Sequence, residues 1–195
     1  MRHDSKDFDI SEYSLVEFIY RTYMKQDFPR NELKPLASIR SLWEQGRYDC
    51  YQMREEENLV GYAFFVKQTE ADKDSYLLDY LAIVPEYRDR GYGSLFLQQL
   101  SRSIADAYCI VVEVEDPDKA DHDAARQQMQ RRLSFYLRGG YRKTQVTVRV
   151  FGVSYRVLEA PGESFHPDEE IREIYASLYR SMLPAAMYKA FIKLT

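Results

Sequence analysis

Apolar residues in this chain follow two different spacings, and each spacing predicts a different kind of element. Where they recur three and four positions apart, they indicate amphipathic helices. Where apolar and polar residues alternate, or where β-branched and aromatic residues form short runs, they indicate strands. The helical spacing predicts helices over residues 12–24, 31–45, 93–107, 122–138 and 168–183, with a last helical turn or two after Pro184.

The strand-like spacing dominates the middle of the chain. Residues 76–84 and 108–115 are apolar on both faces, which is typical of strands in the centre of a sheet. The polar residues 70–75 are expected to form a turn. The complete set of expected strands covers residues 48–53, 59–67, 76–84, 108–115, 141–151 and 153–158.

The order of these elements predicts a mixed α/β domain and not a regular alternation of strand and helix. The candidate boundary is the connector 161–167, which has proline at both ends. We therefore expect one domain over residues 1–160 and a C-terminal helical extension over residues 161–195 that packs on the same domain.

Composition excludes several classes of protein. The 195 residues carry a net charge of −4, whereas a dedicated nucleic-acid binder usually has a basic excess. No apolar run reaches the roughly 20 residues of a membrane-spanning helix, and the first residues lack the apolar segment of a secretory signal. We therefore expect a cytoplasmic protein that binds neither nucleic acid nor membrane.

Cysteine and histidine usage predicts no metal site. Cys50 and Cys109 are the two cysteines, and they form neither a disulfide framework nor a Cys-x-x-Cys pair, so both are expected to be small core residues. The three histidines, His3, His122 and His166, lie in polar, loop-like contexts, where we expect solvated side chains.

The segment 81–97 carries the strongest chemical signal. A buried strand runs into Pro85, and a short loop with Arg88, Arg90, Gly91 and Gly93 then opens directly into a helix. Glycines let a ligand approach the backbone, and the helix N-terminus and two arginines add positive charge. These features predict an anion site that suits a diphosphate. The pattern lacks the Gly-Lys-Ser/Thr of a Walker loop and the third glycine of a dinucleotide fingerprint.

Arg88-x-x-Gly91-x-Gly93, placed after Leu81-Ala82-Ile83-x-Pro85, resembles the acetyl-CoA-binding motif of the GNAT superfamily of N-acetyltransferases. The resemblance covers roughly residues 10–158. It implies that the backbone of Leu81, Ala82 and Ile83 pairs with the pantetheine of acetyl-CoA. It also implies that the pyrophosphate is bound by the loop residues Arg88, Asp89, Arg90, Gly91, Tyr92, Gly93 and Ser94.

A second motif supports the same resemblance. Residues 135–141, FYLRGGY, resemble the GNAT segment in which an aromatic–tyrosine pair ends a helix and a glycine–aromatic step begins the next strand. Tyr136 falls on the position that often acts as general acid toward the departing thiolate. Gly140 and Tyr141 fall on the glycine–aromatic step, whereas Gly139 departs from the bulkier residue often seen there.

The resemblance also implies an architecture. A single GNAT-like domain has a mixed, mostly antiparallel central sheet with helices on both faces. In this chain its splayed parallel pair of middle strands would be residues 76–84 and 108–115, and the helix 93–107 would form the crossover between them. The C-terminal helix would be added to this domain.

The reaction also needs a base near the amine. Glu113 and Glu115 share one face of the strand 108–115, and buried glutamates are costly unless they are used or paired. We prefer Glu115 as base or amine anchor with Glu113 as its partner, and Asp79 is a third candidate. In the structural alternative, the two glutamates pair with arginines such as Arg131, Arg132 or Arg138, and Asp79 is a satisfied buried polar group.

The function expected from these residues is acetyl transfer from acetyl-CoA to a primary amine, by direct attack in a ternary complex and without a metal. A small cationic amine is favoured, because Asp116 and Asp118 add negative charge after the strand 108–115. Two alternatives stay open: a protein or peptide N-acetyltransferase, and a non-catalytic acyl-CoA-binding module. A homodimer also stays open.

Overall fold

The computed structural model describes residues 13–30 and 32–195, which form two compact units. Unit 1 consists of the chain up to Lys67 together with Leu78–Ser103, and unit 2 consists of Gln68–Leu77 together with Ile104–Thr195. His3, for which we expect a solvated side chain, lies outside the described residues. Residues 12 and 31, which begin two of the expected helices, also lie outside them. Within the described part of the chain, no helix has the length and apolarity needed to span a membrane.

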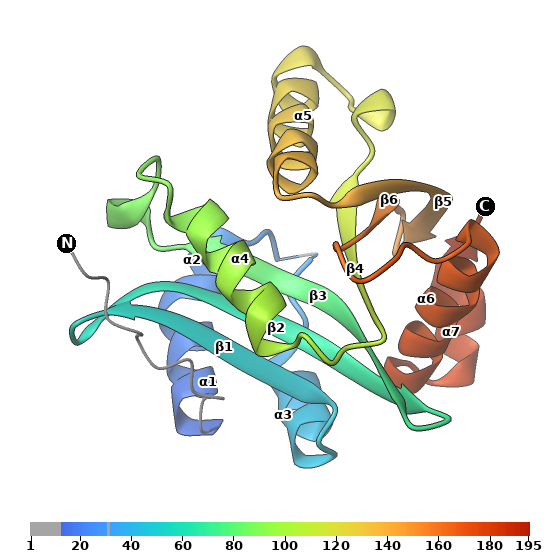
Figure 1. The fold of residues 1–195 in the computed structure, drawn as a ribbon, viewed down its shortest axis with the longest axis horizontal. Helices are drawn as coiled ribbons and strands as arrows, with labels where there is room; N and C mark the ends of the chain where they lie inside the picture. Colours follow the sequence, from blue (N-terminus) through green and yellow to red (C-terminus); the bar gives the residue numbers. More distant parts are fainter. Residues whose placement is uncertain (1–12, 31) are drawn as a thin grey trace. The chain divides into compact units, whose positions relative to one another are not determined.

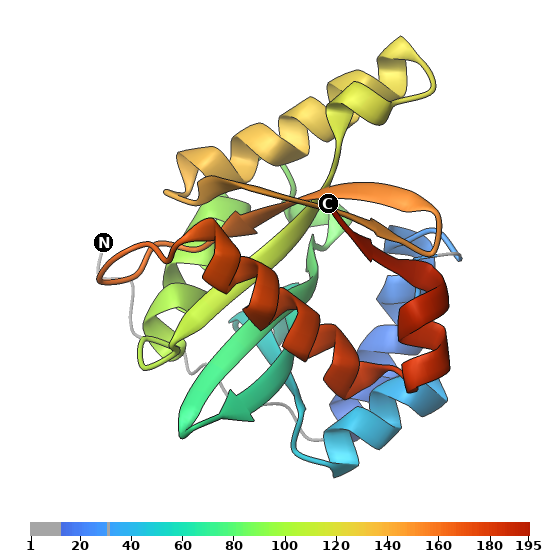
Figure 2. The ribbon, with the colours of Figure 1, turned by 90° about the vertical axis from the view of Figure 1, so that its right-hand side faces the viewer.

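Unit 1 is a strand layer with helices on both faces. Figures 1 and 2 show α1 and α3 on one face of β1, β2 and the end of β3, and α4 on the opposite face. These elements are α1 (Tyr13–Ile19), a π-helical turn (Tyr20–Met24), α2 (Lys25–Asp27), α3 (Leu36–Glu44), β1 (Tyr48–Glu55), β2 (Asn58–Glu70), β3 (Lys73–Ile83) and α4 (Tyr92–Ser103).

The helix α3 begins five residues later than the apolar spacing predicts. Pro35 has extended backbone angles, φ −55° and ψ 138°, and stands immediately before the helix. A proline also disfavours helical backbone at the residue before it. The backbone of that residue, Lys34, is instead bound by two tyrosines: its N–H donates to the Tyr80 hydroxyl at 2.8 Å, and its carbonyl accepts from the Tyr20 hydroxyl at 2.9 Å.

The strands β2 and β3 are longer than expected because the turn between them is shorter. Ala71 and Asp72 both have left-handed backbone, with φ of 49° and 61°, and separate the strands as a two-residue connection. Such primed turns fit the twist of a hairpin and usually carry Asn-Gly or Asp-Gly. Ala-Asp lacks that signal, so the expectation of a turn over the whole of residues 70–75 was wrong.

Unit 2 continues the sheet from the first half of β3. Its further strands are β4 (Cys109–Glu115), β5 (Arg142–Val150), β6 (Val153–Glu159) and β7 (Ile192–Leu194). The hydrogen-bonded order is β1-β2-β3-β4-β6-β5-β7, in which β3 belongs to both units. The pairs β1–β2, β4–β6, β5–β6 and β5–β7 are antiparallel, and β3 and β4 run parallel. The expected mostly antiparallel sheet with a parallel pair of middle strands is confirmed.

Helices of unit 2 flank its strands. They are α5 (Asp123–Arg138), α6 (Asp168–Met182) and α7 (Ala185–Phe191), and α6 contacts both β4 and β5. Figure 2 shows α5 and α6 on opposite sides of β5 and β6. Ile171, Tyr175 and Leu178 of α6 are completely buried, so this helix contributes to the core. The short strand β7, which the apolar spacing did not predict, pairs with β5. The division into residues 1–160 and 161–195 stays a prediction.

Candidate functional site

The loop that follows β3 has the shape of an anion site in unit 1. After β3 ends at Ile83, a short 3-10 turn, Pro85–Tyr87, leads to the loop, and α4 begins at Tyr92. Asp89 and Gly91 have left-handed backbone, with φ of 60° and 84°. At the start of α4, the first backbone N–H groups have no acceptor within the helix. The loop is exposed, so these N–H groups and the helix dipole are available to an anion.

The backbone conformation at position 91, and not a lack of space for a side chain, requires glycine there. A Cβ atom built at this position would meet nothing within 4 Å, whereas its φ of 84° is rarely adopted by residues with a side chain. The space beside this glycine is therefore open in unit 1.

Arg88 is bound within unit 1 by groups that the sequence does not place beside it. Its Nε donates to the Ile83 carbonyl at 2.8 Å, and its Nη2 donates to Asp27 Oδ1 at 2.7 Å. The other Asp27 oxygen accepts from the Tyr62 hydroxyl at 2.6 Å, and burial together with this bond raises the pKa of Tyr62. Arg88 therefore braces the loop against α2 and β2. Asp27 lies 61 positions away in sequence, and no local signal points to it.

The end of β3 is approached closely by β2. Leu81, Ala82 and Ile83, the expected pantetheine strand, are half-buried. A Cβ atom on Gly61 of β2 would lie 2.7 Å from Ile83 Cδ1 and 2.9 Å from the Ala82 carbonyl oxygen. Only glycine fits this approach without displacing the strand.

Tyr136 is buried in the last turn of α5 in unit 2. Its ring packs edge-on against Phe135 at 5.1 Å and Tyr141 at 5.2 Å between ring centroids. Burial raises the pKa of the Tyr136 phenol above its ordinary value, although Arg132 acts in the opposite direction. The phenol therefore stays protonated at neutral pH. Gly140, with φ of 87°, ends the helix in left-handed backbone, which is the usual role of a glycine at this place.

Glu113 and Glu115 of β4 have different partners in unit 2. Glu115 Oε2 accepts a hydrogen bond from Arg132 Nη1 of α5 at 2.5 Å, and Glu113 accepts one from the Tyr175 hydroxyl of α6. Arg132 was among the arginines of the structural alternative, whereas Tyr175 was not anticipated. The Glu115 side chain is 18% exposed and that of Arg132 is 43% exposed, so solvent reaches this ion pair.

The acidic residues after β4 are less available than expected. Asp116 Oδ1 accepts from Arg156 Nε at 2.7 Å, and Asp118 accepts from the same guanidinium. Arg156 lies on β6 beside the end of β4, because Val114 is its register partner. The sheet thus brings one cation to two aspartates and offsets part of the negative charge that was expected there.

Sequence comparison identifies the family to which this chain belongs. The sequence model of the acetyltransferase (GNAT) family matches residues 16–129, more than half of the chain. The chain belongs to the GNAT acetyltransferase family. The matched segment includes the strand 81–83 and the loop 88–94 and ends inside α5.

Solved structures of the GNAT fold resemble this chain throughout most of its length. A candidate acetyltransferase of the GNAT family from Bacteroides thetaiotaomicron is similar with a TM-score of 0.67 and 21% identity, over 89% of this chain and 96% of that one. A chimera of the spermidine N-acetyltransferase from Vibrio cholerae and hSSAT gives 0.57 and 13%, over 80% and 96%. The ribosomal-protein-S18-alanine N-acetyltransferase from Escherichia coli gives 0.54 and 18%, over 82% and 98%. No protein with a curated description matches the chain.

The predicted residues of the GNAT chain fall into two groups. The strand 81–83 and the loop 88–94 lie in unit 1, and Glu113, Glu115 and Tyr136 lie in unit 2. Asp79, the third candidate base, has a structural environment in unit 1: its Oδ1 lies 2.5 Å from Lys34 Nζ, and its Oδ2 accepts from the Tyr48 hydroxyl at 2.5 Å. The Asp79 side chain is only 8% exposed. This favours the alternative in which Asp79 is a satisfied buried polar group.

Replacing Asp79 with asparagine should therefore destabilise the protein. The change leaves the Lys34 ammonium without its buried partner, and we expect the free energy of unfolding to fall by about 2 kcal/mol. Chemical denaturation measures this quantity. As a control, Glu17→Gln removes the exposed Glu17–Arg21 ion pair and should cost less than about 0.5 kcal/mol. Equal effects of the two substitutions would contradict a structural role for Asp79.

Proposed function

We propose that this chain is an acetyl-CoA-dependent N-acetyltransferase that acts on a primary amine, most favourably a small cationic one. The observation that carries the proposal is the loop 88–94, where left-handed backbone at Asp89 and Gly91 leads into the exposed N-terminus of α4. Membership of the GNAT acetyltransferase family supports acyl transfer as the reaction class.

The loop suits the pyrophosphate of acetyl-CoA for a physical reason. The N–H groups of Tyr92, Gly93 and Ser94 begin α4 and lack acceptors within the helix, so they can donate to phosphate oxygens. Arg88 supports the loop through Ile83 and Asp27, which leaves the exposed Arg90 to add positive charge at the loop surface. We infer that the backbone of residues 81–83 pairs with the pantetheine.

The chemistry proceeds by direct attack on the thioester. The amine nitrogen forms a bond to the carbonyl carbon while the carbon–sulfur bond breaks, which yields an amide and CoA. Glu115, with Glu113 as the alternative, accepts the first proton of the ammonium so that the neutral amine can attack, and the nitrogen loses its second proton to solvent as the carbon–sulfur bond breaks. Tyr136 donates a proton to the departing sulfur and is reprotonated from solvent. The Tyr136 phenol is protonated at neutral pH, as a proton donor must be.

The choice of acceptor depends on the carboxylates of unit 2. The Glu115–Arg132 ion pair is partly exposed, so a substrate ammonium could replace the Arg132 guanidinium beside the Glu115 carboxylate. This favours a cationic amine. The fold is shared by solved structures named for spermidine and for a ribosomal protein, and therefore does not discriminate between small and protein acceptors.

The first test is calorimetric titration with acetyl-CoA. We expect binding with a dissociation constant of about 1 to 100 μM, and loss of that binding in Gly91→Trp, because the indole would occupy the open space beside the loop. Arg88→Ala should weaken binding by removing the brace between Asp27 and Ile83. Gly46→Trp is the matched control, because Gly46 also has left-handed backbone and open surroundings but lies before β1.

Absence of heat for the wild type, with no competition by CoA, would remove the enzyme proposal. Equal loss of binding in Gly91→Trp and Gly46→Trp would instead attribute the effect to backbone strain. Binding without turnover across a panel of polyamines, aminoglycosides and arylalkylamines would favour the non-catalytic acyl-CoA-binding module.

A second prediction concerns the acid. Tyr136→Phe keeps the ring that packs on Phe135 and Tyr141 but removes the phenolic proton. We expect kcat to fall about 100-fold with little change in the KM for acetyl-CoA, because a proton donor acts mainly in the transition state. Steady-state kinetics measures both constants. Tyr141→Phe, at the neighbouring buried tyrosine, should leave kcat within about threefold of wild type, and a Tyr136→Phe enzyme with normal kcat would exclude Tyr136 as the acid.

A third prediction concerns the base. Glu115→Gln preserves the shape of the side chain but removes its ability to accept a proton, so kcat/KM for the amine should fall about 100-fold. Glu113→Gln should show the larger loss if the assignment of the two residues is reversed. The measurement is kcat/KM between about pH 6 and pH 9. Near-normal turnover of both variants over this range would exclude both carboxylates.

A further inference from the structure

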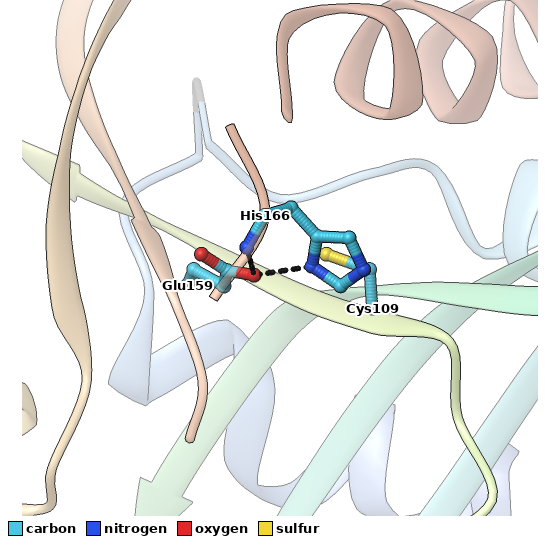
Figure 3. Close-up of side chains that lie close together, drawn as sticks. All are labelled: Cys109, Glu159 and His166. Carbon is cyan, nitrogen blue, oxygen red and sulfur yellow. Dashed lines mark hydrogen bonds and ion pairs between the residues drawn. The ribbon is translucent and has the colours of Figure 1, made fainter. Parts of the chain in front are cut away.

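Three side chains capable of binding a metal converge in unit 2, and none of them is a residue assigned to acetyl transfer. They are Cys109, Glu159 and His166, and one ligand atom from each lies within 4.8 Å of the others. Figure 3 shows the Glu159 carboxylate directed at the His166 ring, which the Cys109 sulfur overlaps in this view. Cys109 and Glu159 are buried, and the His166 side chain is 16% exposed.

The sheet places two of these residues on one face. Cys109 begins β4 and Glu159 ends β6, and the antiparallel register pairs Glu159 directly with Val111. Cross-strand partners project to the same face, and so do residues two apart on one strand. Cys109 is therefore a diagonal neighbour of Glu159 on that face.

The connector between β6 and α6 supplies the third residue. The His166 backbone N–H donates to Glu159 Oε1 at 3.0 Å, and Nδ1 of its ring lies 2.5 Å from the same oxygen. The Arg142 Nη2 donates to the His166 carbonyl at 2.7 Å and so holds the connector from the other side. The prediction of a solvated His166 was wrong, because Glu159 of β6 and Arg142 of β5 bind this residue.

We propose that Cys109, Glu159 and His166 form a binding site for a divalent cation of the zinc type. A thiolate, an imidazole and a carboxylate are the ligand types that zinc takes, and three protein ligands leave a fourth position for water. Tetrahedral bonds of about 2.0–2.3 Å place ligand atoms roughly 3.3–3.7 Å apart. The Nδ1 and Oε1 atoms need to separate slightly, and the sulfur, which lies within 4.8 Å of the other ligand atoms, needs to approach by at most about 1 Å, which side-chain rotation can supply.

The surrounding charges are compatible with a cation. Arg142 donates from Nε and Nη2 to Glu159 Oε2, at 3.0 and 2.8 Å, which leaves Oε1 directed at His166. The Arg142 guanidinium is also paired with Asp168 at 2.7 Å. Glu170 accepts a hydrogen bond from the hydroxyl of Tyr108, the residue before Cys109, and adds a further negative charge that acts on Cys109. A divalent cation would offset the charge of the Glu159 carboxylate and of a Cys109 thiolate.

Cobalt(II) titration of tag-free full-length protein tests the site. A cysteine thiolate on Co²⁺ produces a charge-transfer absorption in the near ultraviolet, and tetrahedral coordination produces visible bands. We expect saturation at one Co²⁺ per chain and displacement by one Zn²⁺. In Cys109→Ser the charge-transfer band should disappear, and in His166→Asn the Co²⁺ affinity should fall by about 100-fold or more.

Matched variants separate this site from other ligands in the chain. Cys50→Ser removes the other buried cysteine, which lies in unit 1, and His122→Asn removes a histidine that caps α5. Both should retain the wild-type spectrum. Far-ultraviolet circular dichroism verifies that each variant is folded.

The wild-type titration decides the proposal even if a variant fails to fold. A wild-type protein that shows no charge-transfer band, or no saturation at one equivalent of Co²⁺, would overturn it and leave a hydrogen-bonded cluster without a cation. A band that survives in Cys109→Ser and is lost in Cys50→Ser would also overturn it.

Discussion

The loop 88–94 of unit 1, the candidate anion site, depends on two hydrogen bonds that the Arg88 guanidinium donates. This guanidinium joins the carbonyl at the end of β3 to the Asp27 carboxylate, and Asp27 is also bound by the Tyr62 hydroxyl. The Asp27 side chain is 8% exposed, so its charge needs these donors. Since the chain turns sharply after Ile83 and passes through two left-handed residues before α4, a fixed end of β3 holds the first N–H groups of α4 in place. The arginine of the motif thus has a structural role beside any electrostatic one.

The sequence predicted the elements that depend on local pattern and missed those that depend on distant partners. The strand, the loop and the helix of residues 81–97 were predictable because glycine, proline and apolar spacing act within a few positions. The strand β7, by contrast, is three residues long and exists because β5 offers an edge to it. The start of α3 was displaced by Pro35 and by the tyrosines that hold Lys34. Pro35 is a local cause, whereas β5 and the two tyrosines are remote in sequence from the segments that they hold.

The candidate bases Asp79 and Glu115 also differ in their partners, which the sequence does not reveal. A sequence shows that burying a glutamate or aspartate of an apolar strand would cost free energy. It does not show whether a hydrogen-bonding or charged partner offsets that cost. Asp79 has Lys34 and Tyr48 on its two oxygens and is nearly inaccessible, so a substrate would have to break both interactions. Glu115 has one arginine at a partly exposed position, where an ion pair contributes little stability and exchanges readily. The difference in exposure, and not the residue type, makes Glu115 a better candidate base than Asp79.

The Arg142 guanidinium explains why His166 is held against the sheet although the rest of the connector 161–167 is exposed. Arg142 binds one oxygen of Glu159, the carboxylate of Asp168 and the carbonyl of His166, so a single cation satisfies acceptors on β6, α6 and the connector. Because Oε2 of Glu159 is thereby occupied, its Oε1 is directed at the imidazole of His166. A buried carboxylate with two different environments on its two oxygens can keep its structural partner and still offer a ligand atom. Cation binding at Cys109, Glu159 and His166 would therefore replace the contact between Nδ1 and Oε1 but leave the Arg142 hydrogen bonds of the network in place.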